Sequence, residues 1–277
     1  MLLRRVFTGA FALLIAGAAH SADLLDTIRN KKEIVVGTEA QFAPFEFVQD
    51  GKVVGYGPDL MNLILEQVPG VKVKQYDVPF QGILPGLATK RFDFVITSVT
   101  MTKERANKFA FTVPIADATV ALITRKADAQ VKSADDIAGK VVGSQAGSAQ
   151  LKALQGYIET LKAQGKPEPT VREYVSFDEA YADLAAGRLV AVAQSKANLA
   201  TLIKARPDVY AIIDSPIGPK TYFGWVGRKD DDSASLVKFF SDGIAQAAKS
   251  GKMAELQKKW FGFTMDVPTD TVPAPEL

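Results

Sequence analysis

The sequence predicts an α/β protein made of two similar lobes, each a mostly parallel sheet flanked by helices. Two observations support this prediction. Short apolar stretches typical of buried strands alternate along the chain with amphipathic stretches typical of helices. In addition, residues 140–144 resemble residues 33–38, and residues 184–193 resemble residues 87–96. Both repeats recur after roughly 100 residues, which favours two lobes built alike over a chance likeness between helix–strand joints.

The first helices and strands are predicted from the spacing of apolar residues and from the glycines and prolines that end each element. Residues 24–32 are expected to form a short helix, and residues 33–37 a buried strand that ends in a glycine. A helix over residues 58–68 has Asp59 near its start and stops at Pro69 and Gly70. Further elements are expected as a strand over residues 71–78, a helix over residues 83–90 and an apolar strand over residues 92–96.

The N-terminus has the layout of a secretory signal peptide. Arg4 and Arg5 precede an apolar stretch over residues 6–17, and small residues follow. The apolar stretch is too short for a permanent membrane anchor, and no polar face marks it as a buried helix. Cleavage after Ala19, Ser21 or Ala22 fits this layout, so we expect residues 1–22 to be removed.

Composition excludes several classes of function. The chain has no cysteine, and its one histidine is His20, inside or beside the predicted signal peptide. The mature chain therefore lacks the residues for disulfides, a Ser-His-Asp triad, a Cys-His pair or an ordinary zinc site. Without residues 1–22, 31 basic and 31 acidic residues remain. With no long basic run, we expect no nucleic-acid partner, no metal and no cofactor.

Ligands of open parallel sheets bind beyond the carboxyl ends of the strands. Two such lobes that face each other would place those ends on either side of one cleft. The segments expected to line the cleft are residues 38–42, 97–100, 144–150 and 194–195.

Four motifs extend this interpretation, and they occur in a characteristic order and spacing. They are Val36-Gly37-Thr38-Glu39 with Pro44-Phe45-Glu46-Phe47, then Gly82 to Leu87, Thr100 to Arg105, and Lys259-Trp260-Phe261-Gly262. Over nearly the whole mature chain, the sequence resembles the polar amino-acid family (family 3) of periplasmic solute-binding proteins of ABC importers. The resemblance implies a type II periplasmic-binding-protein fold whose lobes close on a ligand about two hinge crossovers.

The resemblance also implies a domain division. Residues 23–116 with 222–270 form the first lobe, and residues 117–221 form the second. The crossovers are expected near residues 115–119 and 218–223. Residues 271–277, at the end of a Pro-rich tail, are expected to be loose.

In the first lobe, the resemblance assigns ligand binding to a turn and a helix. Arg105 matches the position that binds the ligand's carboxylate, which suits a guanidinium fork with two parallel donors. The alternative for Arg105 is a surface residue paired with Glu104. Thr100 matches a position that also holds the carboxylate, and Thr97 and Ser98 line the same turn.

Three more residues of the first lobe match ligand-contacting positions. Phe42 and Phe80 match two aromatic walls on either side of the ligand's side chain, and we expect them in loops rather than in the lobe cores. Glu39 lies where some relatives meet a polar or cationic ligand group. Its alternative is a solvated loop carboxylate.

In the second lobe, Gln145 and Ser148 belong to a turn that matches a ligand-binding one, and Ser148 also suits a helix N-cap. The family places an aspartate for the ligand's α-ammonium where this chain has Ser195, after Gln194. A neutral hydroxyl cannot supply that charge. Either Glu39 or a neighbour binds the ammonium, or the ligand is a carboxylate without one.

The predicted function is therefore the periplasmic substrate-binding component of an ABC importer, with an amino acid or a related small carboxylate as its ligand. The expected partner is a permease at the inner membrane, and the expected state is a monomer without enzymatic activity. The alternative is a cyclohexadienyl-dehydratase-like lyase on the same scaffold, with Glu39 or Glu173 as its acid or base. A fused receptor sensor is disfavoured, because no later segment of the sequence is a transmembrane candidate.

Overall fold

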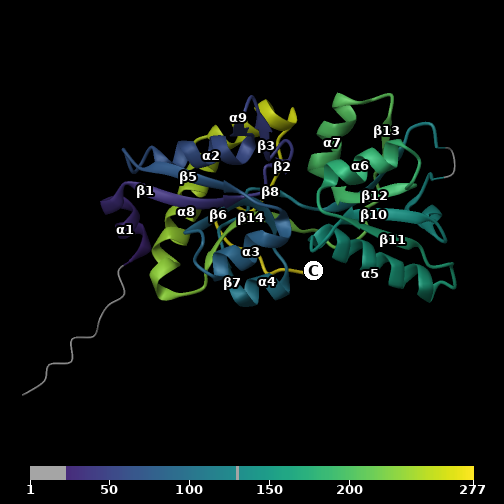
Figure 1. Ribbon diagram of the computed structural model, residues 1–277, viewed down its shortest axis with the longest axis horizontal. Helices are drawn as coiled ribbons and strands as arrows, with labels where there is room; N and C mark the ends of the chain where they lie inside the picture. Colours follow the sequence, from purple (N-terminus) through teal and green to yellow (C-terminus); the bar gives the residue numbers. More distant parts are fainter. Residues whose placement is uncertain (1–22, 129–130) are drawn as a thin grey trace, which may run out of the picture.

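The computed structural model describes residues 23–128 and 131–277, and these form two lobes that lie side by side (Figure 1). The predicted two-lobed α/β architecture is confirmed. Each lobe has its own mixed sheet with helices on both faces. The predicted signal peptide, residues 1–22, lies outside the described residues.

The sheet of the first lobe joins the beginning of the chain to its last strand. Strands β1, β5 and β6 run parallel, and β14 pairs antiparallel with β6. The strand order is β5 (Lys72–Asp77), β1 (Glu33–Thr38), β6 (Phe94–Thr100), β14 (Tyr222–Arg228) and β7 (Phe109–Phe111), with β8 (Ala116–Asp117) also paired to β14.

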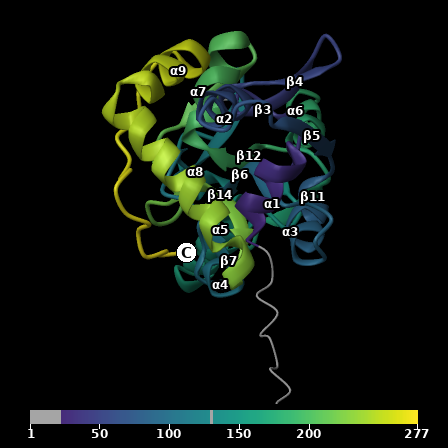
Figure 2. The ribbon, with the colours of Figure 1, turned by 90° about the vertical axis from the view of Figure 1, so that its left-hand side faces the viewer.

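Apolar side chains on both faces of β6 explain why this sheet is covered twice. Phe94 and Ile96 pack toward one helical layer, whereas Val95 and Val99 pack toward the other. Viewed from the first lobe, α8 and α3 lie on opposite sides of β6 and β14 (Figure 2). The first layer contains α1 (Leu24–Lys31), α2 (Tyr56–Leu65), α8 (Asp231–Lys249) and α9 (Lys252–Phe261), and the second contains α3 (Phe80–Ala88) and α4 (Lys103–Lys108).

The sheet of the second lobe repeats the arrangement of the first. Its parallel strands β11, β10 and β12 correspond to β5, β1 and β6, and β9 pairs antiparallel with β12. The strand order is β11 (Thr170–Tyr174), β10 (Val141–Gln145), β12 (Ala191–Ser195), β9 (Val120–Arg125) and β13 (Tyr210–Ile213). The flanking helices are α5 (Ala149–Ala163), α6 (Phe177–Ala185) and α7 (Lys196–Ala205), with a 3-10 turn, η1, at Ala134–Ile137.

The chain passes from the first sheet to the second between β8 and β9, and it returns between β13 and β14.

A small antiparallel sheet also belongs to the first part of the chain. Its strands are β2 (Gln41–Phe42), β3 (Glu46–Gln49) and β4 (Lys52–Val54).

The structure differs from the sequence-based expectation in the ends of several elements and in the tail; β6, for example, spans Phe94–Thr100 rather than residues 92–96. Helix α3 begins at Phe80 rather than at residue 83, directly after Pro79, and α2 ends at Leu65 rather than at residue 68. The tail expected to be loose makes specific contacts: the Lys103 backbone amide donates to the Leu277 backbone oxygen at 3.0 Å. Leu277 also packs against the apolar cluster of the second lobe.

Candidate functional site

The carboxyl ends of the parallel strands meet between the lobes, as the fold predicts. Among the described residues, three side-chain hydrogen bonds cross this boundary. The Gln145 amide donates to the Glu39 carboxyl, and Arg105 Nη2 donates to the Gly147 carbonyl at 3.0 Å. Asn198 Nδ2 donates to the Ala43 carbonyl at 2.8 Å. The lobes are therefore closed on one another, with polar groups at their contact surface.

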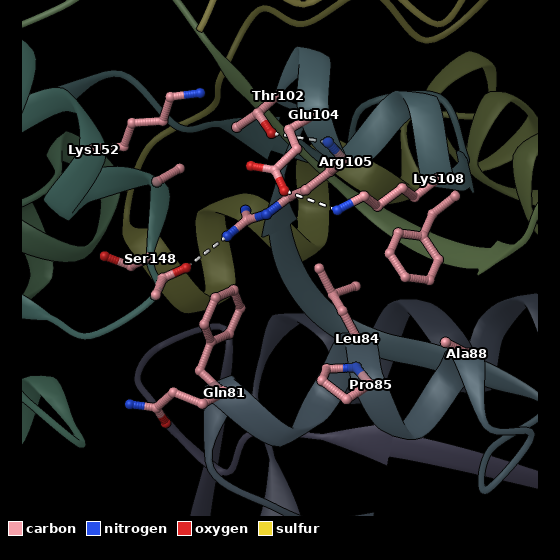
Figure 3. A pocket seen from close by; sticks show the side chains of 14 residues that line it. Gln81, Leu84, Pro85, Ala88, Thr102, Glu104, Arg105, Lys108, Ser148 and Lys152 are labelled. Atoms are coloured by element: carbon pink, nitrogen blue, oxygen red, sulfur yellow. Dashed lines mark hydrogen bonds and ion pairs between the residues drawn. The ribbon is translucent and has the colours of Figure 1, made fainter.

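Arg105 extends from α4 toward the second lobe (Figure 3). Thr102 caps α4 by accepting from the Arg105 backbone amide, which sets where the helix begins. The guanidinium donates from Nη1 to the Thr100 carbonyl at 3.0 Å, and its carbon lies 5.2 Å from the centre of the Phe80 ring. Burial lowers the pKa of Arg105 to about 10, so the side chain stays cationic at neutral pH.

A cavity of about 450 Å³ opens beside this arginine, between α3 and α4 of the first lobe and the start of α5 (Figure 3). Lys152 lines it from α5, and Lys108 lines it from α4. The Lys108 ammonium pairs with Glu104 at 3.0 Å. The cavity therefore has more positive than negative groups around it, which suits an anionic ligand group.

The predicted polar residues of β6 are buried, and two of them are bonded to an acid that the sequence analysis did not single out. The Thr97 and Ser98 hydroxyls donate to the Glu46 carboxyl at 3.3 and 3.1 Å. Glu46 is fully buried, and this desolvation raises its pKa well above its ordinary value. The sequence does contain a hint of this role, because Glu46 is a charged residue among the apolar residues Pro44, Phe45 and Phe47.

Glu39 is buried between the lobes and is 4% exposed, so it is not the solvated loop carboxylate that was the alternative. Burial is the main cause that raises its pKa to about 8. The hydrogen bond from Gln145 opposes this shift, whereas the charges of Asp77 and Asp178 reinforce it.

Neither of the two predicted aromatic walls lies in a loop, and both belong to buried apolar clusters of the core, contrary to the expectation. Phe80 is the first residue of α3, lines the cavity beside Arg105 and lies against its guanidinium. Phe42 lies in β2 and packs at ring-centroid distances of 5.8 Å against Phe223 and against Phe177 of the second lobe. Phe42 thus joins the apolar core and also lines a second cavity between the lobes, of about 260 Å³.

The predicted residues of the second lobe lie along one edge of its sheet. Ser148 caps α5 by accepting from the Leu151 amide at 3.0 Å, and it also lines the cavity beside Arg105. Gln145 ends β10, and Gln194 and Ser195 end the neighbouring strand β12. Arg105, Glu39 and Gln145 take part in hydrogen bonds between the lobes, Phe80 and Ser148 line the cavity beside Arg105, and Phe42 and Gln194 line the second cavity. The remaining predicted residues are buried in β6 or at the end of β12: Thr97, Ser98, Thr100 and Ser195.

Asn198 is the second cleft residue that sequence analysis did not single out. It lies in the first turn of α7, three residues after Ser195, and the hydroxyl of Ser195 donates to its Oδ1. Ser195 and Asn198 have the spacing of a helix N-cap and a polar residue at position N3. This pattern could have identified Asn198 from the sequence.

Within residues 23–128 and 131–277, no group of three or more histidine, cysteine, aspartate or glutamate residues could hold a metal ion. In the same part of the chain, no helix is both long and apolar enough to cross a membrane.

The chain is similar to known proteins over most of its length. Residues 34–263 match the family of bacterial extracellular solute-binding proteins, family 3. The L-cystine-binding protein TcyJ of Escherichia coli is 29% identical over 266 residues, which cover 94% of this chain and 96% of that protein.

Solved structures show the same fold. A mutant of ArgBP from T. maritima superposes with a TM-score of 0.74 at 33% identity, covering 86% of this chain and 99% of that one. The ancestral amino acid-binding protein AncCDT-1, described as a precursor of cyclohexadienyl dehydratase, superposes with a TM-score of 0.75 at 28% identity. That comparison covers 87% of this chain and all of the other.

Proposed function

Because the chain belongs to family 3 of the bacterial extracellular solute-binding proteins, we propose that it captures an amino acid or a related small carboxylate between its lobes and delivers it to an ABC importer. The relatives named as cystine- and arginine-binding proteins support an amino-acid-like ligand. With the predicted signal peptide removed, the protein would act in the periplasm, as a monomer that docks on a permease at the inner membrane.

The observation behind this proposal is that Arg105 reaches from one lobe to the other. Its guanidinium lies over Phe80 of the first lobe and donates to Gly147 of the second. A carboxylate bound to this fork would contact the Ser148 turn as well, and so would touch both lobes at once. Such a ligand binds the closed form better than the open form and shifts the population toward closure.

The test is a thermal-shift screen of the mature protein, residues 23–277, against amino acids and simple carboxylates. A ligand at 100 times its dissociation constant should add about 2.7 kcal/mol of stability. Arg105→Ala should remove this shift, because it deletes the two donors that would bind the carboxylate.

Arg91→Ala is the matched control. Arg91 also lies over an aromatic ring, that of Phe92, but it is exposed and lines neither the cavity beside Arg105 nor the second cavity at Phe42. It should keep the full ligand shift. A screen without any Arg105-dependent shift would count against the proposal.

The second candidate function is a dehydratase-like lyase, and the observation that favours it is the buried carboxyl of Glu39. A carboxyl whose pKa is about 8 is protonated at neutral pH and can act as a general acid. Glu173, the other candidate, is exposed on β11 and is a poor match for this role. Formation of phenylpyruvate from prephenate by the purified protein, lost in Glu39→Gln, would establish catalysis. An absence of turnover would leave the binding function alone.

A further inference from the structure

The end of strand β12 is a buried network of neutral side chains. Ser195 is fully buried and caps α7, and its hydroxyl donates to Asn198 Oδ1. Next to it, Gln194 Oε1 accepts from the Ser195 backbone amide at 2.7 Å and from Gln150 Nε2 at 3.0 Å. The hydroxyl proton of Ser195 and both lone pairs of the Gln194 amide oxygen are thus used within the protein, and Asn198 Oδ1 already accepts one hydrogen bond.

The same network connects the two lobes. Asn198 is 3% exposed, and its Nδ2 donates to the Ala43 carbonyl at 2.8 Å. Because Oδ1 of this amide accepts the proton of Ser195, Nδ2 is left to face Ala43. The bond to Ala43 joins α7 of the second lobe to the segment after β2 of the first, so it forms when the lobes close.

This network adjoins the place where a carboxylate would bind. Arg105 donates to Gly147, which lies two residues before the start of α5. The first turn of α5 then carries Gln150, which donates to Gln194 at the end of β12. A ligand whose carboxylate is held by Arg105 and the Ser148 turn would therefore have its next carbon close to this edge of the second sheet.

A cation at that carbon would meet no carboxylate at the end of β12. The acid that lines the second cavity with Gln194 and Asn198 is Asp178, at the start of α6, and burial raises its pKa. Glu39 is bonded to Gln145, and Glu46 is bonded to Thr97 and Ser98. Burial also raises the pKa of both carboxyls, to about 8 for Glu39. Burying an ammonium beside neutral groups that are already bonded is unfavourable.

We infer that Ser195 and Asn198 determine ligand specificity, and that the preferred ligand is a carboxylate with no ammonium group on the neighbouring carbon. Such ligands include 2-oxo, 2-hydroxy and unsubstituted carboxylates. In this chain the Asn198–Ala43 hydrogen bond contributes to lobe closure without a charge on the ligand. The inference rests on the proposed function, because it requires that Arg105 holds the carboxylate.

The test compares matched pairs of compounds that differ only in the ammonium group. The pairs are L-glutamate and glutarate, L-phenylalanine and 3-phenylpropanoate, and L-arginine and 5-guanidinopentanoate. Dissociation constants are measured by titration calorimetry for the mature protein and for Arg105→Ala. In each pair that binds, we expect the ammonium-free member to bind at least about tenfold more tightly, because the amino acid would bury an unpaired ammonium.

Ser195→Asp places a carboxylate in the network and should reverse this preference. Asn198→Asp keeps the shape of the side chain, adds the charge at a neighbouring atom and removes the bond to Ala43. Asn198→Asp should also shift the binding preference toward the amino acid, and it replaces Ser195→Asp in the test if that variant fails to fold. Circular dichroism of each variant shows whether the fold is retained.

The outcomes separate the inference from the function on which it rests. If the amino acid of a pair binds as tightly as its analogue or more tightly, the inference is wrong while the proposed function stands. Loss of that tight binding in Asp178→Asn would then assign the ammonium to Asp178, which lines the second cavity. If none of the six compounds binds in an Arg105-dependent way, both the function and the inference fall.

Discussion

At the scale of single residues, the buried carboxyl of Glu39 links closure of the cleft to pH. Its pKa rises from an ordinary value of 4.5 to about 8 in the closed structure, mainly through burial. The groups that face it are Gln145, which donates a hydrogen bond, and the carboxyls of Glu46, Asp77 and Asp178. The closed protein therefore holds a proton that an unfolded or hydrated Glu39 would release.

We predict that stability falls as pH rises from about 4.5 to about 8, because the folded state binds the extra proton throughout this window. The slope due to Glu39 is at most about 1.4 kcal/mol per pH unit. Melting temperatures of the ligand-free protein and of Glu39→Gln, measured from pH 5 to pH 8, should diverge as the pH increases. The variant should show the shallower profile, because it lacks the titration of Glu39 and also the charge of Glu39 that raises the pKa of Glu46. Parallel profiles would contradict this account.

The contacts of single residues are also where sequence reasoning reached its limit. It identified Arg105, Glu39 and Ser195 as cleft residues, and the structure places Arg105 and Glu39 in hydrogen bonds between the lobes. Ser195 is buried at the start of α7 and bonds Asn198, which crosses to the first lobe. Sequence reasoning did not identify Glu46 or Asn198. Their partners lie 51 and 155 residues away in the sequence, and such pairings depend on how elements pack rather than on local pattern.

At the scale of secondary-structure elements, close contact between α3 and the first sheet depends on two glycines. The ring of Phe92 is fully buried between Gly37 of β1 and Gly86 of α3, and a Cβ atom at either glycine would overlap it. This contact fixes where α3 lies, and with it the position of Phe80 at the start of the helix, beside Arg105.

Gly86→Ala should therefore destabilise the protein by about 1–3 kcal/mol through overpacking against Phe92. The matched control is Gly156→Ala in α5, where the added Cβ atom would meet nothing within 4 Å. That substitution should stabilise the protein by about 0.5–1 kcal/mol, because alanine favours helix more than glycine does. Urea unfolding of both variants measures the difference. A neutral Gly86→Ala would mean that α3 can move away from the sheet without loss.

The elements themselves were more predictable than their ends. Alternation of apolar strands with amphipathic helices predicted α1, β1, α2, β5, α3 and β6 in the correct order, because burial on both faces of a strand leaves a clear apolar run. The start of α3 was predicted three residues late, since Phe80 and Gln81 give no periodic signal of their own. The short strands β2, β3, β4 and β8 were not predicted. Strands β2 and β8 have two residues each, too few for an alternating pattern, and β8 is held by pairing with the distant β14.

At the scale of the whole molecule, the tail adds a further connection between the lobes. It is anchored on the first lobe near its start, where the Met265 amide donates to Gln257 of α9 at 2.8 Å. At its far end, Lys103 of α4 donates to the Glu276 and Leu277 backbone oxygens at 3.0 Å. Leu277 meanwhile packs against the second lobe, and the tail ends between the two lobes (Figure 1).

Because Leu277 contacts both lobes in the closed arrangement, removing residues 268–277 should favour the open form. We predict a several-fold loss of affinity for any ligand found in the screen, with a larger radius of gyration of the liganded protein in small-angle X-ray scattering. Leu277→Ala keeps the backbone bonds to Lys103 and removes most of the apolar contact, so it should produce part of the same loss. The anchor at Met265 remains in both variants, so the first lobe should stay intact. Unchanged affinity together with a lower melting temperature would mean that the tail stabilises the fold and has no part in closure.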